Sequence, residues 1–179
     1  MPAILIAMNL YAQSEVEVKD HYFGGGLNVG ISGSANIYAP TLWYAFGNHK
    51  LEIAAGTKYF NTYYKTWFPF PFESLVLNLS YKVYPWTNKF KYNLYFQSIG
   101  EYGIVFPPFF NPITSSITQY KLLLGSGLEI FLSKRCILSF DLSAGALFTH
   151  NTRNDMEPAF NTWRADAYGR ISFGYKFIK

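Results

Sequence analysis

One short segment of the chain carries the residue types of nucleophilic catalysis. His150 and Thr152 stand two positions apart, and Asp155, Glu157 and Asp166 follow them along the sequence. A histidine that accepts the proton of a nearby hydroxyl can turn a threonine into a nucleophile, and a carboxylate can orient that histidine. His150, Thr152 and Glu157 are therefore the candidate catalytic residues. The plainer interpretation is that His150 is an ordinary polar residue at the end of a strand.

The composition limits the class of protein that could position such residues. Half of the 179 residues are hydrophobic, 20% are aromatic and 15% are charged, whereas roughly 25% of residues are charged in ordinary soluble domains. Disordered chains are charged and poor in aromatic residues, so this chain is not disordered. Its single cysteine excludes a disulfide framework and leaves too few thiols for a structural zinc site. We expect no metal and no cofactor.

Nucleic acid is also excluded as a partner. The net charge is +4, and the basic residues are dispersed along the chain instead of forming a stripe. Gly24, Gly25 and Gly26 do not form a phosphate-binding loop, because no Lys-Ser or Lys-Thr pair follows them and no helix is predicted after them.

Hydrophobic and polar residues alternate with period two along most of the chain, and clusters of Gly, Pro, Asn, Ser and Lys interrupt the alternation. This pattern predicts β-strands, and helical spacing fits no segment better. The chain is therefore predicted to be all-β. The eight predicted strands are Tyr22–Ser32, Thr41–Phe46, Leu51–Phe60, Ser74–Val83, Tyr92–Ile104, Gln119–Leu132, Leu138–Phe148 and Arg170–Phe177.

The predicted connections alternate strictly between short and long. Three are short and polar, at 47–50, 85–91 and 133–136, and the longer links lie at 33–40, 61–73, 105–118 and 151–163. Tight periplasmic turns and long external loops are typical of a transmembrane barrel, and eight strands agree with the even strand number of bacterial barrels. The prediction is an eight-stranded antiparallel up-and-down transmembrane β-barrel with short periplasmic turns and longer external loops.

The alternation alone leaves open which face of the barrel is outside. In a soluble, lipocalin-like carrier the apolar face would surround a ligand, and the polar face would meet water. Here the polar face is mostly Gly, Ser, Asn and Ala, which suits a narrow interior filled by side chains. Its isolated charges balance in sign, so they can pair with one another. The predicted interior charge network is Glu52, Lys58, Lys82, Glu101, Glu129, Asp141, Arg170 and Lys176.

The apolar face is almost free of charge, as contact with hydrocarbon requires. Membrane barrels carry belts of aromatic residues at both interfaces. The residues predicted for these belts are Tyr22, Tyr44, Tyr59, Tyr84, Trp86, Tyr102, Trp163 and Tyr175.

The start of the chain is predicted to be a remnant of an export signal. Residues 1–12 are largely apolar and end in Leu10-Tyr11-Ala12, although the positively charged leading region of a signal peptide is missing. The alternative is a buried N-terminal strand or short helix. Residues 13–21 are then a periplasmic segment, and residues 22–179 form the barrel.

With this layout the chain resembles the small outer-membrane β-barrels of the OmpA and OmpX type over about residues 22–179. The last strand, with Ile171, Phe173, Tyr175 and Phe177 at alternate positions, is similar to the C-terminal assembly signal of such barrels, but Ile178 and Lys179 follow the final aromatic residue. The resemblance implies the bacterial outer membrane as location. It implies membrane lipid, lipopolysaccharide and the barrel-assembly machinery as partners.

Barrels of this size have filled interiors, so a wide pore is not expected even in a porin-like protein. The resemblance also extends to barrel enzymes that remove acyl chains from lipid A with a histidine and a serine at the external rim, a role that His150 could fill although Thr152 stands in place of the serine. The main prediction is a non-enzymatic barrel with a structural or surface-interaction role. Its external aromatic loop is expected to meet a protein or extracellular partner, and the alternative is that the loop folds over the barrel mouth or into the interface with its aromatic side chains buried. The aromatic residues of this loop are Tyr63, Tyr64, Trp67, Phe68, Phe70 and Phe72.

Overall fold

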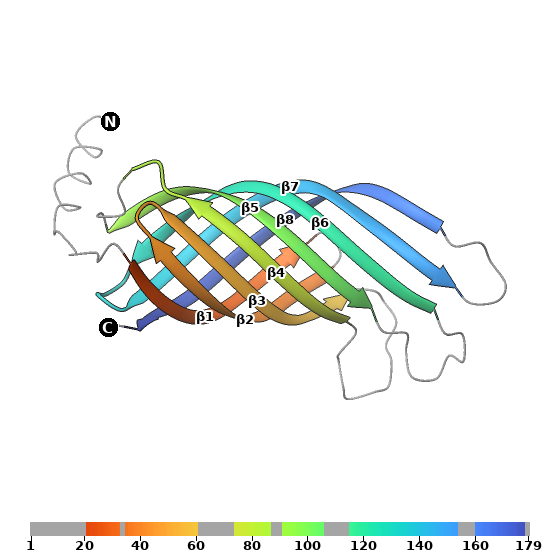
Figure 1. Cartoon of the computed structure of the whole chain (residues 1–179), viewed down its shortest axis with the longest axis horizontal. Coiled ribbons are helices and arrows are strands. Elements are labelled where there is room, and N and C mark those ends of the chain that lie inside the picture. The colour runs from red at the N-terminus through yellow and green to blue at the C-terminus, as the bar shows by residue number, and fades with distance from the viewer. Residues whose placement is uncertain are drawn as a thin grey trace.

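The strands close into a single barrel. The computed structural model describes residues 21–32, 35–60, 74–86, 91–105, 115–153 and 160–177. In these residues eight antiparallel strands follow one another in chain order, and the last pairs with the first (Figure 1). This confirms the predicted fold class. The strands are β1 (His21–Ser32), β2 (Ala35–Phe46), β3 (His49–Phe60), β4 (Ser74–Val83), β5 (Tyr92–Val105), β6 (Ser115–Phe131), β7 (Cys136–Arg153) and β8 (Phe160–Phe177).

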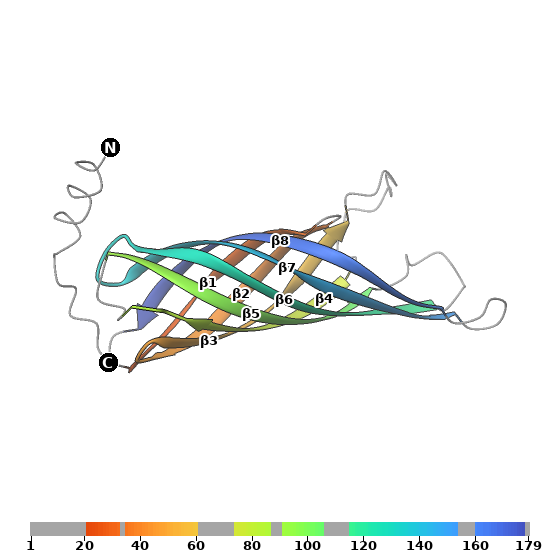
Figure 2. The ribbon, with the colours of Figure 1, turned by 90° about the horizontal axis from the view of Figure 1, so that it is seen from above.

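The strands are staggered around the barrel. Starting at Tyr22 and following paired residues from strand to strand, one returns to β1 at Ser32, ten residues further along. A barrel closes with such a stagger only if its strands are tilted, typically by about 35–45° from the axis, and the tilt is visible in Figure 2. Eight strands enclose a space just wide enough for side chains to fill.

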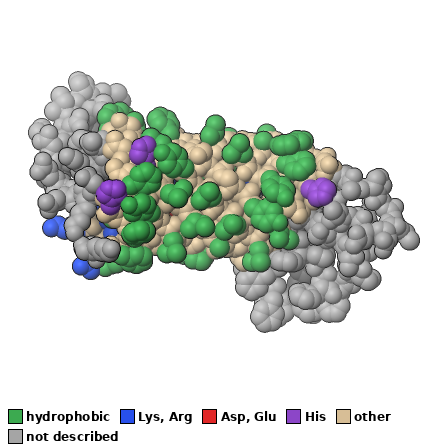
Figure 3. Space-filling view, in the orientation of Figure 1, with side chains coloured by type: hydrophobic (Ala, Val, Ile, Leu, Met, Phe, Trp, Pro, Cys, Tyr) green, Lys and Arg blue, Asp and Glu red, His purple; other side chains and the backbone are tan. Residues whose placement is uncertain are grey.

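Apolar side chains cover the outside of the barrel. The burial pattern of β4 alternates without a break over its first nine residues, with Leu75, Leu77 and Leu79 exposed and Ser74, Val76, Asn78 and Ser80 buried. Every other strand exposes leucine, isoleucine, valine or aromatic side chains in the same way. Figure 3 shows these side chains over the wall of the barrel, with no Asp or Glu on the face in view. A soluble carrier would have its apolar face inside, so the lipocalin-like alternative is wrong.

Two of the predicted belt residues point inward instead. Tyr84 is buried and continues the even-numbered inward positions of β4, so it lies beside Lys82 and not in the lipid interface. Tyr22 likewise follows the inward positions of β1 and packs against a buried cluster that contains Trp43. Both residues have the same parity as the polar residues of their predicted strands, so the alternation itself indicated an inward position for them. Tyr59 lies in β3, but its side chain is outside the described residues.

Two of the predicted long links are mostly strand. β2 begins at Ala35, so only residues 33–34 separate it from β1, where the sequence had predicted a link over 33–40. β7 runs to Arg153 and β8 begins at Phe160, where a link over 151–163 had been predicted. The strict alternation of short and long connections is therefore wrong at the first link. The β2–β3 connection is the tight hairpin Gly47-Asn48, where Gly47 adopts a φ of 54° that favours glycine.

β6, β7 and β8 are also longer than the other strands. They have 17, 18 and 18 residues, whereas β1 to β4 have 10 to 12. Their extra residues extend the wall beyond the end at which β1–β5 stop, as Figure 1 shows. In the described residues there is no helix long and apolar enough to cross a membrane.

We expect a charged side chain on the outer wall to destabilise the barrel more at the centre of the bilayer than near its surface. Leu124 lies near the middle of β6 with 68% of its surface exposed. A Leu124→Arg substitution should lower the free energy of unfolding in lipid vesicles by about 2–4 kcal/mol, because the charge would lie at the centre of the bilayer. The measurement is a denaturant titration followed by tryptophan fluorescence.

Leu132 offers a matched control at the turn after β6, with 54% of its surface exposed. There, Leu132→Arg should cost about 0–1 kcal/mol, since arginine near the interface reaches the headgroups. Equal and small losses for the two variants would contradict a lipid-facing wall.

Candidate functional site

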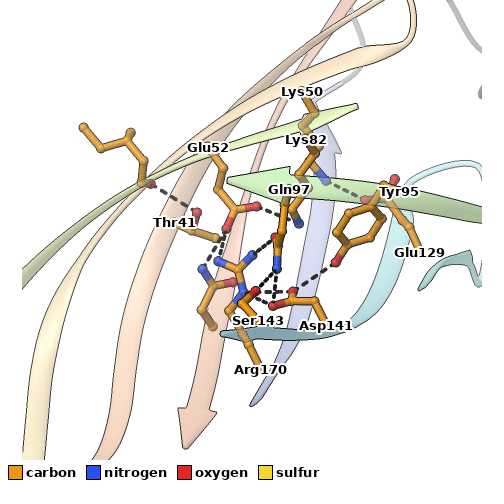
Figure 4. A network of polar contacts seen from close by, with 12 residues as sticks. Thr41, Lys50, Glu52, Lys82, Tyr95, Gln97, Glu129, Asp141, Ser143 and Arg170 are labelled. Carbon is orange, nitrogen blue, oxygen red and sulfur yellow. Dashed lines mark hydrogen bonds and ion pairs between the residues drawn. The ribbon is translucent and has the colours of Figure 1, made fainter. Parts of the chain in front are cut away.

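The interior of the barrel is organised around Arg170 of β8. Its Nη1 donates to Glu52 Oε1 at 2.8 Å, its Nε donates to Asp141 Oδ2 at 3.0 Å, and its Nη2 donates to Gln97 Oε1 at 3.0 Å. The guanidinium therefore lies between two carboxylates from different strands, as Figure 4 shows. All four side chains are buried. A buried guanidinium is tolerated only when its charge is paired and hydrogen-bonded, and here each of its three nitrogens donates to a buried oxygen.

Neighbouring polar side chains hold Asp141 in place. Tyr95 OH donates to Asp141 Oδ2 at 2.9 Å, and Gln97 Nε2 donates to Asp141 Oδ1 at 2.7 Å and to Ser143 Oγ at 2.9 Å. Gln97 thus accepts from Arg170 with its oxygen and donates to Asp141 with its nitrogen. This bonding fixes the orientation of the amide and joins β5, β7 and β8 across the interior.

The same network continues toward the turn end of the barrel. Lys82 Nζ lies 3.2 Å from Glu52 Oε2, and Lys50 Nζ lies 2.7 Å from Glu129 Oε2. Tyr84 OH donates to the same Glu129 oxygen at 3.1 Å. We call the whole set the lower network. It contains three acids and three bases, namely Glu52, Glu129, Asp141, Lys50, Lys82 and Arg170.

A second network lies closer to the far end of the barrel, and we call it the upper network. Glu101 pairs with Lys58 and lies 3.6 Å from Lys121 Nζ. Lys121 also pairs with Asp166 and donates to Ser32 Oγ at 2.6 Å, while Ser32 Oγ donates to Asp166 Oδ2 at 2.8 Å. This network contains two acids and two bases, so its charges balance as those of the lower network do.

An apolar layer separates the two networks. On β5 the consecutive inward residues are Gln97 in the lower network, Ile99 in the apolar layer and Glu101 in the upper network. The inward residues of β8 follow the same order. Because apolar side chains offer no hydrogen bonds, each network must satisfy its own charges. The buried members of the layer are Ile37, Ala39, Ala54, Ile99, Leu123 and Tyr168.

Aromatic side chains close the barrel below the lower network. Trp43, Phe131 and Ile137 form a buried cluster against which Tyr22 packs. Lys176 Nζ lies 4.1 Å from the centre of the Tyr22 ring and 3.9 Å from that of Phe131. The ring faces attract the ammonium, which has no ion pair with a described carboxylate.

Glycines make room for the large inward side chains. A β-carbon at Gly24 would overlap the indole of Trp43, and one at Gly30 would overlap the Tyr168 ring. A small pocket of about 10 Å³ lies beside Asn28 and Ser172, which is about the smallest volume that can hold one water molecule. The described interior is therefore closely filled.

The structure places all eight residues of the predicted charge network inside the barrel. Seven of them form ion pairs with one another or with Lys50 and Lys121. Lys121 also pairs with Asp166, so the networks include three interior residues that were not assigned to the predicted set. Lys50 lies in the predicted short connection over 47–50, and Lys121 lies in the predicted strand Gln119–Leu132 but was not assigned to the network. Both residues continue the alternation of their strands at positions that point inward, so the sequence pattern could have identified them.

Of the three catalytic candidates, only His150 has a side chain among the described residues. His150 Nδ1 lies 2.6 Å from Asn161 Oδ1 on the neighbouring strand β8. Asp166, expected near His150, belongs instead to the upper network. Thr152 lies in β7, but its side chain is outside the described residues, as is all of Glu157. No group of three metal-binding side chains occurs in the described part of the chain.

The other two histidines lie within hydrogen-bond distance of tyrosine hydroxyls. His21 and His49 begin β1 and β3, and their Nδ1 atoms lie 2.9 and 2.7 Å from the hydroxyls of Tyr44 and Tyr81. The external aromatic loop with Tyr63, Tyr64, Trp67, Phe68, Phe70 and Phe72 lies outside the described residues.

Comparison with solved structures supports the fold. No protein-family model matches the chain, and no curated protein does. The N-terminal β-barrel domain of Pseudomonas aeruginosa OprF matches with a TM-score of 0.61 and 9% identity, over 89% of this chain and 98% of that one. Neisserial surface protein A matches with a TM-score of 0.48 and 14% identity, over 88% and 96% of the two chains. OprG from Pseudomonas aeruginosa matches with a TM-score of 0.49 and 12% identity, over 89% and 96%.

At these identities the likeness shows the fold alone. The closed barrel, its apolar outer wall and the likeness to the OprF barrel define a membrane β-barrel of the eight-stranded outer-membrane type.

Reversing one buried charge tests the paired interior. We expect Glu129→Lys to lower the free energy of unfolding by at least about 3 kcal/mol, because it removes the partner of Lys50 and adds a cation beside it. The measurement is a denaturant titration in detergent micelles or vesicles.

The double variant Lys50→Glu/Glu129→Lys is the matched control, since it restores a pair of opposite charges at the same place. It should recover a clear part of the lost stability. A loss below about 0.5 kcal/mol for Glu129→Lys, as for an ordinary surface substitution, would contradict the paired interior.

Proposed function

We propose that this chain is a non-enzymatic barrel of the bacterial outer membrane that anchors its external loops at the cell surface and does not transport solutes. The observation that supports this proposal is the filled interior. From the turn end, the interior holds the buried cluster of Trp43, Phe131 and Ile137, then the lower network, the apolar layer and the upper network. An ion would have to displace paired charges and then enter an apolar layer, which is costly without water or a partner.

If the barrel is an anchor, the longer loops are the part of the protein that contacts a partner. The loop over 61–73 carries six aromatic side chains, and the link over 106–114 adds Phe106, Phe109 and Phe110. Exposed apolar patches mark interaction surfaces on proteins. We propose an extracellular or protein partner for them, with lipopolysaccharide around the barrel and the barrel-assembly machinery acting during insertion.

Conductance tests the closed interior. The purified barrel, reconstituted in a planar bilayer, should give no stable current steps above those of the empty bilayer, because the interior leaves no continuous path for ions. A known porin in the same bilayer is the positive control. Reproducible steps that disappear when the protein is omitted would contradict the anchor proposal and indicate a channel.

Lipid A composition tests the alternative of an acyl-removing enzyme. Mass spectra of lipid A should be the same for cells that express the protein, cells that express His150→Ala and cells without it. The contact between His150 and the side-chain amide of Asn161 supports a structural role for this histidine, as a hydrogen-bond partner of β8. Loss of an acyl chain in cells with the unchanged protein, and its retention with His150→Ala, would support the enzyme instead.

A further inference from the structure

The turn end of the barrel carries an exposed basic rim on the side of β5 to β8. It consists of Lys91, which directly precedes β5, and of Lys134 and Arg135 in the β6–β7 turn. We propose that the basic rim binds the phosphate headgroups of anionic phospholipids in the leaflet that it meets. This inference rests on the proposed insertion in a membrane, and it adds a lipid preference that insertion alone does not require.

The three basic residues lie on neighbouring backbone segments. The Phe131 amide donates to the Lys91 carbonyl at 2.9 Å, and the Lys176 amide donates to the Arg135 carbonyl at 2.7 Å. The start of β5, the β6–β7 turn and the end of β8 are thus joined side by side. All three basic side chains are exposed, and Figure 3 shows Lys and Arg side chains gathered at this end of the molecule.

No acidic side chain in the described part of the chain is available to neutralise the rim. Its acidic residues are all committed to the two interior networks, where each is paired with a lysine or with Arg170. The rim therefore presents positive charge outward from the described barrel. A cluster of basic residues at the edge of a bilayer attracts anionic lipid, with each residue near the surface contributing to the attraction. The acidic residues are Glu52, Glu101, Glu129, Asp141 and Asp166.

The surroundings of the rim place it at headgroup depth. Arg135 Nη1 donates to the Tyr175 hydroxyl at 2.9 Å, and Lys91 Nζ lies 5.8 Å from the centre of the Tyr92 ring. Exposed tyrosines of this kind mark the interface between hydrocarbon and water. Leu132, next to the rim in the same turn, is exposed and apolar. A phospholipid with its acyl chains against this wall would bring its phosphate to the basic side chains.

At the same end of the barrel, the side formed by β1 to β4 carries different side chains, so the attraction of anionic lipid is expected on the β5–β8 side. Across β1 to β4, stacked rings join Tyr44 to Phe46, Phe46 to His49 and His49 to Tyr81. His21 stacks on Tyr44 as well. This row offers rings and tyrosine hydroxyls instead of lysine and arginine. We therefore expect anionic lipid to concentrate beside β5–β8.

Native mass spectrometry of the barrel in detergent micelles tests the proposal. Phosphatidylglycerol and phosphatidylcholine with the same acyl chains are titrated separately, and the bound lipids are counted. The unchanged protein should bind phosphatidylglycerol about fivefold more tightly than phosphatidylcholine, a factor that corresponds to about one favourable headgroup contact. The preference should weaken as the ionic strength rises.

The triple variant Lys91→Gln/Lys134→Gln/Arg135→Gln should bind the two lipids equally. Arg164→Gln is the matched control, because Arg164 is an exposed basic residue of β8 far from the turns, and it should keep the preference. Mobility in SDS before and after boiling confirms that each variant is folded.

Equal binding of the two lipids by the folded, unchanged protein would overturn the basic rim as a lipid site. A preference that survives in the triple variant would overturn it too. A preference that emerges only after removal of residues 1–20, which contain Glu15, Glu17 and Asp20, would overturn lipid binding by the full chain. It would indicate that the chain's own acidic residues neutralise the rim. A protein that shows no heat-dependent mobility and stays out of membranes would instead contradict the proposed function.

Discussion

The pairing of charges inside a narrow barrel is the constraint on which the rest of the structure depends. Because the apolar side chains point outward, the polar side chains of all eight strands point into the barrel. An eight-stranded barrel has little space for water between them. Each buried charge must therefore have its partner within the protein. Arg170 meets this condition with three strands at once, since it bonds to Glu52, Gln97 and Asp141. The interior contacts thus join strands that are distant around the wall.

The sequence predicted the side of the wall on which each of these charges lies, because period-two alternation assigns every residue of a strand once one residue is assigned. It could not predict which acid meets which base. Glu52 and Arg170 are 118 positions apart, and their contact depends on the stagger accumulated around the whole barrel. The same limit explains Asp166, whose partner Lys121 lies on a strand that it does not pair with directly.

The ends of the strands were harder to predict than their middles. Over 160–167 the sequence reads Phe-Asn-Thr-Trp-Arg-Ala-Asp-Ala, with weak contrast between odd and even positions. Strand residues beyond the bilayer have polar surroundings on both faces, so selection for an apolar face is absent and the periodic signal fades. β7 and β8 nevertheless stay paired up to Asn151 and Phe160, because backbone hydrogen bonds continue where the side-chain pattern does not.

The apolar layer around Ile99 and Leu123 divides the interior into two compartments, and the charge network in each is balanced by itself. A change of charge in one compartment needs its compensation in that compartment and has no bearing on the other. The interior is then free to diverge one compartment at a time, by coupled replacement of an acid and its base. Distant relatives would share the barrel and the balance of acids and bases within each network while having few residues in common.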